Sequence, residues 1–174
     1  LYDRLKKEIH SVFNRAEYTG FILINIDGFS KINDSYGHII GDQVIKEVGS
    51  RIVGSFPEES TVARWSGAEF AVLTPHLSDK KNMATLLHNL FDACDRPVSV
   101  DEYRIAVKLS AGVVFFPDDG RNESQLIQNA HLALTRAKKP GKGQFSFFDV
   151  SLDHETLNRL VLEDEFRDSD FERD

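Results

Sequence analysis

The sequence contains one cysteine, one tryptophan and one methionine among 174 residues. A single cysteine has no partner in its own chain, so Cys94 forms no internal disulfide, and we expect a reducing compartment such as the cytoplasm. The sequence also lacks an apolar run long enough to span a bilayer, and it does not open with a secretion signal. We therefore expect no membrane contact by this segment, although an upstream part of the full protein could still anchor it.

Positive charge is scarce as well. The chain has 21 Lys and Arg residues against 28 Asp and Glu residues, a formal net charge of -7 at pH 7. This balance disfavours non-specific binding to a nucleic-acid polymer, although a local basic patch can still hold a phosphate ligand. The hydrophobic share of 41% and the charged share of 28% are typical of a globular domain with one core. A nucleotide is therefore a better candidate ligand than a polymer.

Hydrophobic periodicity and turn residues predict an alternation of helices and strands. An apolar run that ends in a carboxylate predicts a buried strand, and apolar residues three and four apart predict helices. We expect Ser78 and Asn122 to cap two of the helices, and Gly112 to mark a bulge or a close backbone approach. The expected elements are a lead-in helix within 1–20, a strand at 21–27, a helix at 44–56, a hairpin at 61–73, a helix at 78–96, a hairpin and strand at 97–117, a helix at 122–139, a strand at 144–149 and a helix at 154–168.

This order predicts an α/β (α+β) fold. A strand-helix-strand-strand-helix-strand series forms a ferredoxin-like βαββαβ unit, with a central, mostly antiparallel sheet flanked by helices. We expect residues 1–150 to form one domain and residues 151–174 to form a separate C-terminal helix. Because the chain starts at Leu1 and both ends have helical patterns, we also expect it to be a domain excised from a longer protein.

Three motifs carry a resemblance to a known family. The stretches "NIDGFSKINDSYGHIIGD", "ARWSGAEFAVL" and "AHLALTRAKKPGKGQF" resemble the GGDEF family, the bacterial diguanylate cyclase domain, in both order and spacing. The resemblance runs from about Phe21 to Asp149. It implies the palm-like sheet of nucleotidyl cyclases and the condensation of two GTP molecules into cyclic di-GMP by two subunits that meet head to head.

The resemblance also implies where a catalytic Mg²⁺ ion would be held. In the family, one metal-binding carboxylate ends the first strand and another is the third residue of the signature turn, and these positions are Asn25 and Ala68 here. Asparagine offers a neutral carbonyl oxygen and alanine offers no ligand. The remaining weak candidates are the Ile26 backbone carbonyl and Glu69, and Ser66 replaces the first glycine of the turn. We therefore expect no intact catalytic site, a weak or absent Mg²⁺ site and no required cofactor.

Residues that read guanine in the family are retained. They are Asn33 and Asp42, and a carboxylate can accept hydrogen bonds from N1–H and the exocyclic amine of guanine, which adenine cannot supply. Gly67, the glycine that remains in the turn, is a further nucleotide-binding candidate. The alternative is that Asp42 caps the helix beginning after Gly41 and that Asn33 braces the loop. The residues alone leave both interpretations open.

The phosphate-binding positions are only partly retained. Lys138 matches a phosphate-binding lysine of the family, and Lys142 stands where many members carry a basic residue. Ser30, however, replaces a lysine that usually contacts phosphate. A solvated lysine face explains Lys138 and Lys142 equally well. We expect a weaker grip on phosphate than in an active member.

The product-inhibition motif of the family is absent. It is an RxxD sequence placed just upstream of the signature turn, and the same spacing gives Pro57 and Ser60 here. Without the arginine and the aspartate, we expect no cyclic di-GMP binding at this position.

The C-terminal stretch "LNRLVLEDEFRDS" resembles the helix that joins a GGDEF domain to a following EAL phosphodiesterase domain. An ordinary amphipathic helix, with Leu157, Leu160, Val161 and Phe166 inward, is the alternative. If the linker interpretation holds, the functional output lies beyond Asp174.

Three functional hypotheses follow. The first is a catalytically degenerate GGDEF domain that binds GTP and modulates a linked EAL phosphodiesterase, as a regulatory module in cyclic di-GMP signalling. The second is an interaction scaffold that mediates dimerisation and has only a vestigial nucleotide pocket. The third is a residual diguanylate cyclase with an altered metal geometry. Guanine-selective binding that disappears in Asp42→Ala would separate the first from the second, and cyclic di-GMP production would support the third.

Overall fold

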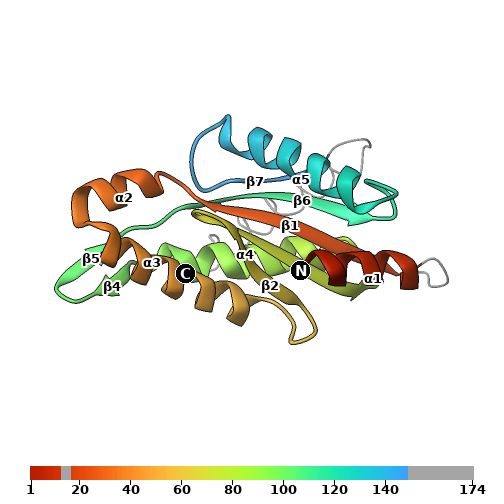
Figure 1. The fold of residues 1–174 in the computed structure, drawn as a ribbon, viewed down its shortest axis with the longest axis horizontal. Helices are drawn as coiled ribbons and strands as arrows, with labels where there is room; N and C mark the ends of the chain where they lie inside the picture. The colour runs from red at the N-terminus through yellow and green to blue at the C-terminus, as the bar shows by residue number, and fades with distance from the viewer. Residues whose placement is uncertain (13–16, 149–174) are drawn as a thin grey trace, which may run out of the picture.

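The fold is that of a computed structural model, which describes residues 1–12 and 17–148 of the chain. Within this range the chain forms alternating helices and strands around one sheet (Figure 1). The elements are α1 (Tyr2–Val12), β1 (Tyr18–Ile26), α2 (Phe29–Tyr36), α3 (His38–Ser55), β2 (Thr61–Ser66), β3 (Glu69–Leu77), α4 (Lys81–Asp95), β4 (Val98–Val100), β5 (Tyr103–Ile105), β6 (Leu109–Phe116), α5 (Glu123–Lys138) and β7 (Phe145–Phe147). The helix expected at 154–168 lies outside the described residues. None of the described helices combines the length and apolar character that a bilayer span requires.

The main sheet has five strands in the order β2-β3-β1-β6-β7. Strand β1 lies at its centre and runs antiparallel to both β3 and β6, β2 runs antiparallel to β3, and β7 is parallel to β6. Strands β4 and β5 form a separate two-stranded sheet. The α+β class and the mostly antiparallel sheet are thus confirmed, with β7 added to the edge of the βαββαβ unit.

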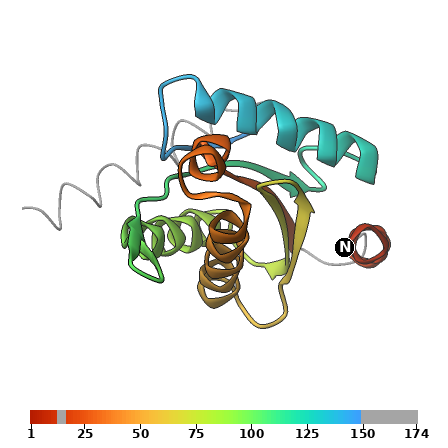
Figure 2. The ribbon, with the colours of Figure 1, turned by 60° about the vertical axis from the view of Figure 1, so that its left-hand side comes forward.

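The two faces of the sheet are covered by different helices. Alternate residues of a strand point to opposite faces. Ile22 and Ile24 of β1 belong to the core cluster shared with α3 and α4, whereas Phe21 and Leu23 belong to the cluster shared with α1 and α5. Figure 2 shows α5 on one side of the sheet and α3 and α4 on the other. The burial of β1 on both faces explains its nearly continuous apolar sequence.

Gly112 lets α5 approach the sheet closely. A Cβ atom at Gly112 would overlap the backbone of Ala130 and Leu134, so only glycine fits between β6 and α5. The expected close backbone approach is confirmed.

One helix was missed and another begins earlier than expected. Residues 29–36 form α2, and α3 begins at His38 instead of near residue 44. Gly28 and Gly37 have φ values of 66° and 85°, a backbone region that glycine adopts without penalty, and they turn the chain into α2 and then α3. The largely polar α2 has eight residues and buries only Ile32, so the sequence offers few apolar positions from which to predict it.

The two predicted helix caps had different outcomes. Asn122 caps α5 through its side chain, which accepts a 2.9 Å hydrogen bond from the Gln125 backbone N–H. Ser78 is not the cap of α4, because the helix begins at Lys81 and the Asp79 carboxylate accepts from the Lys81 N–H at 2.9 Å. The short side chain of Asp79, two residues before the first helical residue, therefore accepts the hydrogen bond that was expected of Ser78.

The single cysteine and the single tryptophan both serve packing. Cys94 is 3% exposed on the apolar face of α4, and burial raises the pKa of its thiol to about 11. Trp65 is half-buried on β2 and packs edge to face against Phe21, with 6.2 Å between ring centroids.

Candidate functional site

The end of β1 lies directly beside the hairpin turn of residues 66–69. Asn25 pairs with Glu69 across the β1–β3 ladder, and the Ile26 backbone N–H donates to the Ala68 carbonyl oxygen at 2.9 Å. Gly67 has a φ of 50°. Tight turns between antiparallel strands commonly place a residue in this left-handed region, which glycine adopts readily. The fold therefore brings together the two positions that the sequence pattern assigned to a metal.

Neither of these positions carries a carboxylate, and the nearby Glu69 faces another partner. Ala68 packs against the core cluster on the α3 side, and Asn25 is half-buried. The Glu69 side chain is only 16% exposed, and its Oε1 lies 3.9 Å from Nδ1 of His131 on α5. The weak metal candidate Glu69 is thus directed towards α5.

Asp27, which was not among the site residues predicted from the sequence, is engaged in hydrogen bonds through both carboxylate oxygens. Both oxygens lie 2.8 Å from the Ser110 hydroxyl, which donates to them, and Oδ2 also accepts from the Gly143 N–H at 3.1 Å. The carboxylate fastens the end of β1 to β6 and to the loop after α5. Its position as the last residue of an apolar run was the signal that could have identified it.

The residues around the turn do not fit a Mg²⁺ ion. This cation requires near-octahedral oxygen coordination, to which proteins contribute chiefly carboxylates. Residues 1–12 and 17–148 contain no group of three or more His, Cys, Asp or Glu side chains that could hold a metal ion. At the turn, Asp27 and Glu69 are already paired, and Asn25 and Ala68 bring no charge. The side chains at this end of the sheet therefore support no catalytic step through a metal.

Asn33, Gly41 and Asp42, which we call the guanine side, lie together where α2 contacts α3. A Cβ atom at Gly41 would overlap the Asn33 Oδ1 and would lie 3.2 Å from the Phe29 ring. Asn33 Oδ1 is buried and has no hydrogen-bond partner among the described residues. An orphaned buried oxygen costs stability, so its retention calls for a reason such as a ligand site.

The capping interpretation of Asp42 is wrong. Helix α3 begins at His38 with Gly37 at its N-cap, which places Asp42 in the fifth helical position, one full turn inside. Asp42 is exposed, and no described residue pairs with its carboxylate. Asn33 lies within α2 rather than in a loop, so its expected loop-bracing role is wrong as well.

The basic candidates lie at the end of α5 and in the loop that follows. Lys142 Nζ lies above Gly28, 3.2 Å from the point that a Cβ atom there would occupy. The loop is fixed by the Gly143–Asp27 hydrogen bond, so Lys142 is carried to the end of β1. Lys138 is exposed in the last turn of α5, and Ser30 is exposed on α2.

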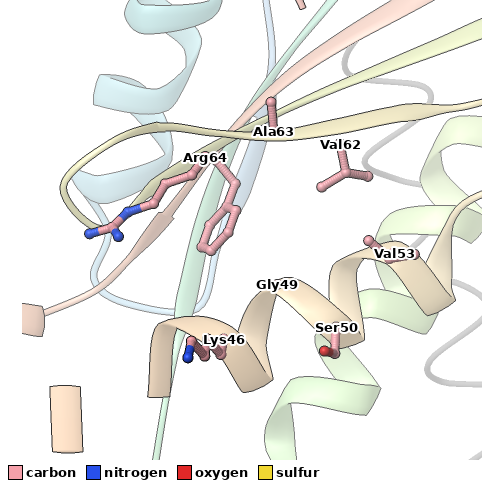
Figure 3. Close-up of a pocket in the computed structure, with 8 residues that line it drawn as sticks. Lys46, Gly49, Ser50, Val53, Val62, Ala63 and Arg64 are labelled. Atoms are coloured by element: carbon pink, nitrogen blue, oxygen red, sulfur yellow. The ribbon is translucent and has the colours of Figure 1, made fainter. Parts of the chain in front are cut away.

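A groove of about 440 Å³ runs between α3 and the β2–β3 hairpin (Figure 3). Its volume is in the range of small-molecule sites. Lys46 and Arg64 lie at one end and Val53 at the other. We call it the α3 groove; its lining residues are Lys46, Gly49, Ser50, Val53, Val62, Ala63, Arg64 and Phe70.

Asp42 of the guanine side shares one face of α3 with residues that line the α3 groove. Asp42, Lys46, Gly49 and Val53 follow one another at spacings of four, three and four residues, which places them in one row on the helix. Gly49 leaves the floor open, since a Cβ there would lie 3.3 Å from the Phe70 ring. This spacing was the signal by which sequence reasoning could have found Lys46.

Residues 1–144 match the family described as "Diguanylate cyclase, GGDEF domain". The chain belongs to the GGDEF family. The solved structures agree: the GGDEF domain of TpbB (YfiN) from Pseudomonas aeruginosa superposes with a TM-score of 0.83 at 26% identity, covering 86% of this chain and 94% of that one. An EAL/GGDEF domain protein from M. capsulatus superposes with a TM-score of 0.75 at 30% identity, covering 84% and 95%.

Curated relatives of this GGDEF domain are larger signalling proteins. The bifunctional diguanylate cyclase/cyclic di-GMP phosphodiesterase MucR of Pseudomonas aeruginosa is 30% identical over 93% of this chain and 24% of its own length. The cyclic di-GMP phosphodiesterase NbdA of the same organism is 33% identical over 88% of this chain and 19% of its own length. The chain thus spans a quarter or less of these relatives, and it is a GGDEF domain of the kind found in cyclic di-GMP signalling.

Proposed function

We propose that this GGDEF domain is a catalytically degenerate regulatory module that binds GTP and modulates an EAL phosphodiesterase domain of the same protein. One observation carries the proposal: the guanine side is assembled, while the two metal positions at the turn are Asn25 and Ala68. A domain built in this way can bind a guanine nucleotide without converting it into cyclic di-GMP.

The chemistry of the guanine side supports selective recognition. Asp42 is exposed and, among the described residues, has no competing partner, so both carboxylate oxygens can accept from guanine. Adenine presents an acceptor at N1 where guanine presents a donor, so one carboxylate oxygen would face a lone pair instead of an N–H. Asn33 lies beside Asp42 through its packing on Gly41.

The names of the relatives support the EAL part of the proposal. MucR is named as both a cyclase and a phosphodiesterase, NbdA as a phosphodiesterase, and the M. capsulatus structure as an EAL/GGDEF protein. A nucleotide can regulate a linked domain only if it binds more tightly to one state of the whole protein than to the other.

Competition binding tests the nucleotide part. A fluorescently labelled guanine nucleotide bound to the 1–174 chain is expected to be displaced by GTP and not by ATP, as measured by fluorescence anisotropy. Equal displacement by the two nucleotides would contradict guanine recognition.

Two activity measurements test the rest. With GTP and either Mg²⁺ or Mn²⁺, we expect no cyclic di-GMP above background, and product formation would instead revive the residual cyclase. In the full-length protein, we expect GTP to change the rate of cyclic di-GMP hydrolysis and Asp42→Ala to abolish that change. An unchanged rate in the wild type would contradict the regulatory role.

The scaffold alternative is favoured by an exposed apolar patch beside the guanine side. Ile39 is 78% exposed at the start of α3, and Tyr36 packs edge to face on Tyr103 with both rings partly open to solvent. A second copy of the chain would bury this patch. Light scattering would then show a dimer that Ile39→Asp converts to a monomer, and a monomeric wild type would remove this alternative.

A further inference from the structure

The hairpin turn lacks carboxylates at the two positions assigned to a metal, and the two carboxylates that remain beside it already have partners. Asp27 accepts hydrogen bonds from Ser110 and Gly143, and Glu69 lies opposite His131. Asn25 and Ala68 are uncharged. The two positions that would supply the anionic ligands of a metal–phosphate site are therefore uncharged.

Cationic side chains lie near this end of the sheet. Arg64 Nε donates to the Gly67 carbonyl oxygen at 2.8 Å, which holds the guanidinium at the turn. Lys46 faces the same end of the α3 groove (Figure 3), and no described carboxylate pairs with either residue. Lys142 adds a third cation above Gly28, at the end of β1.

This arrangement resembles a site for a bare phosphate chain. Arginine and lysine bind phosphate oxygens through charge-assisted hydrogen bonds, and the attraction grows with the negative charge of the ligand. A Mg²⁺ ion on the same oxygens occupies those lone pairs and cancels two negative charges. Among the residues described at the turn, the carboxylates that would bind the metal are absent or already have partners.

We propose that this domain binds GTP as the metal-free anion, with Lys46 and Arg64 holding the phosphates, so that Mg²⁺ weakens binding instead of promoting it. The inference rests on the proposed GTP binding and adds the form of the ligand and the residues that select it. Because the attraction is electrostatic, affinity falls in the order GTP, GDP, GMP, and it falls further as salt is added.

The test compares GTP binding to the 1–174 chain in a chelator and in saturating Mg²⁺ at matched ionic strength. We expect binding in chelator to be tighter by about threefold or more, from the loss of Coulomb attraction to the Mg²⁺ complex. A requirement for Mg²⁺ would overturn the inference and leave the proposed function standing. Absence of GTP binding in both buffers, with the fold intact by circular dichroism, would overturn both.

Variants test the residues. Lys46→Gln and Arg64→Gln are each expected to bring the ratio of the GTP affinity in chelator to the GTP affinity in Mg²⁺ towards one. A purely structural role would not produce this effect. Arg64→Lys keeps the charge and should retain most of the ratio even if the bond to Gly67 weakens. Lys7→Gln on the exposed face of α1 is the matched control and should leave the ratio unchanged. An unchanged ratio in both glutamine variants would contradict the assignment.

The converse variant returns the missing charge. Asn25→Asp with Ala68→Glu is expected to reverse the sign of the Mg²⁺ effect, so that GTP binds more tightly with the metal. Asn25→Asp alone, a nearly isosteric change, should shift the ratio in the same direction if the double variant fails to fold. A Mg²⁺ effect that both variants leave untouched would contradict the proposed metal-free binding.

Discussion

The guanine side and the hairpin turn are two halves of one site that differ in the side chains they retain. On the guanine side, Asn33 packs on Gly41 beside an exposed Asp42, so recognition groups and the glycine that makes room for them are all present. At the turn, the backbone geometry is kept through the Ile26–Ala68 hydrogen bond, whereas the ligands are not. The backbone is therefore kept in both places, and only the guanine side keeps the side chains that the proposed GTP recognition needs.

This difference has a physical reason. The turn is held by strand pairing and by Gly67, neither of which depends on a metal ligand, so Asn25 and Ala68 cost the fold little. The guanine side places a buried, unpaired Asn33 oxygen against α3, which is a cost to stability that folding alone does not explain.

The largest effect is expected from Asp42→Ala. Losing hydrogen bonds to a charged acceptor costs about 1.5–3 kcal/mol, so GTP affinity should fall by roughly tenfold to more than a hundredfold. Asp34→Ala, which removes an exposed carboxylate from α2, is the matched control. Equal GTP affinities of Asp42→Ala and the wild type, measured by calorimetry, would contradict the proposed recognition of guanine by Asp42.

Gly41→Ala should disturb the guanine side through packing. The added methyl group overlaps Asn33 Oδ1, so we expect a loss of about 1–3 kcal/mol in the free energy of unfolding, measured by urea denaturation. Gly54 lies on the same helix, and a Cβ atom there would meet nothing within 4 Å. Gly54→Ala should therefore raise the free energy of unfolding by about 0.5–1 kcal/mol. Two alanine variants of equal stability would contradict the described contact.

Asp27→Asn tests whether that carboxylate is structural. The change removes charge-assisted acceptance from Ser110 and Gly143, and we expect a loss of about 1–2 kcal/mol in unfolding free energy. The effect on the Mg²⁺ dependence of GTP binding should be small. A large change in that dependence with little loss of stability would instead make Asp27 a metal ligand.

Glu69→Gln should have the smallest effect. The pair with His131 is 3.9 Å long and His131 is half-exposed, so the change in stability should stay within about 0.5 kcal/mol. GTP affinity should also stay within about twofold, as judged by the same calorimetry. A tenfold loss of affinity that appears only in Mg²⁺ would show that Glu69 binds the metal after all.

Much of the fold was predictable because it rests on strong local patterns. The buried strand β1, the hairpin at the turn and the Asn122 cap all followed from periodicity or from single residues with known geometry. Helix α2 was missed because it buries a single residue, and Ser78 was chosen as a cap because sequence alone does not show which nearby acceptor reaches the first helical N–H.

The parts of the candidate site that lie in sequence motifs were predictable. The parts that form only through tertiary packing were not. The positions Asn25, Ala68, Asn33 and Asp42 came from the resemblance, and the fold brings each pair together. Lys46 and Arg64 come from a helix and a strand that meet only in the folded chain, so no spacing joined them in advance. The roles of Lys138 and Lys142 in phosphate binding stay predictions.

The most direct test of GTP recognition by this domain is a calorimetric titration of the 1–174 chain with GTP in chelator, with ATP as the control ligand. We predict saturable heat with GTP and none with ATP, because in our proposal the guanine side recognises the base and Lys46 and Arg64 of the α3 groove hold the phosphates without a metal. Silence with both nucleotides at millimolar concentration, from a folded sample, would contradict this prediction and leave the scaffold as the better description of this domain.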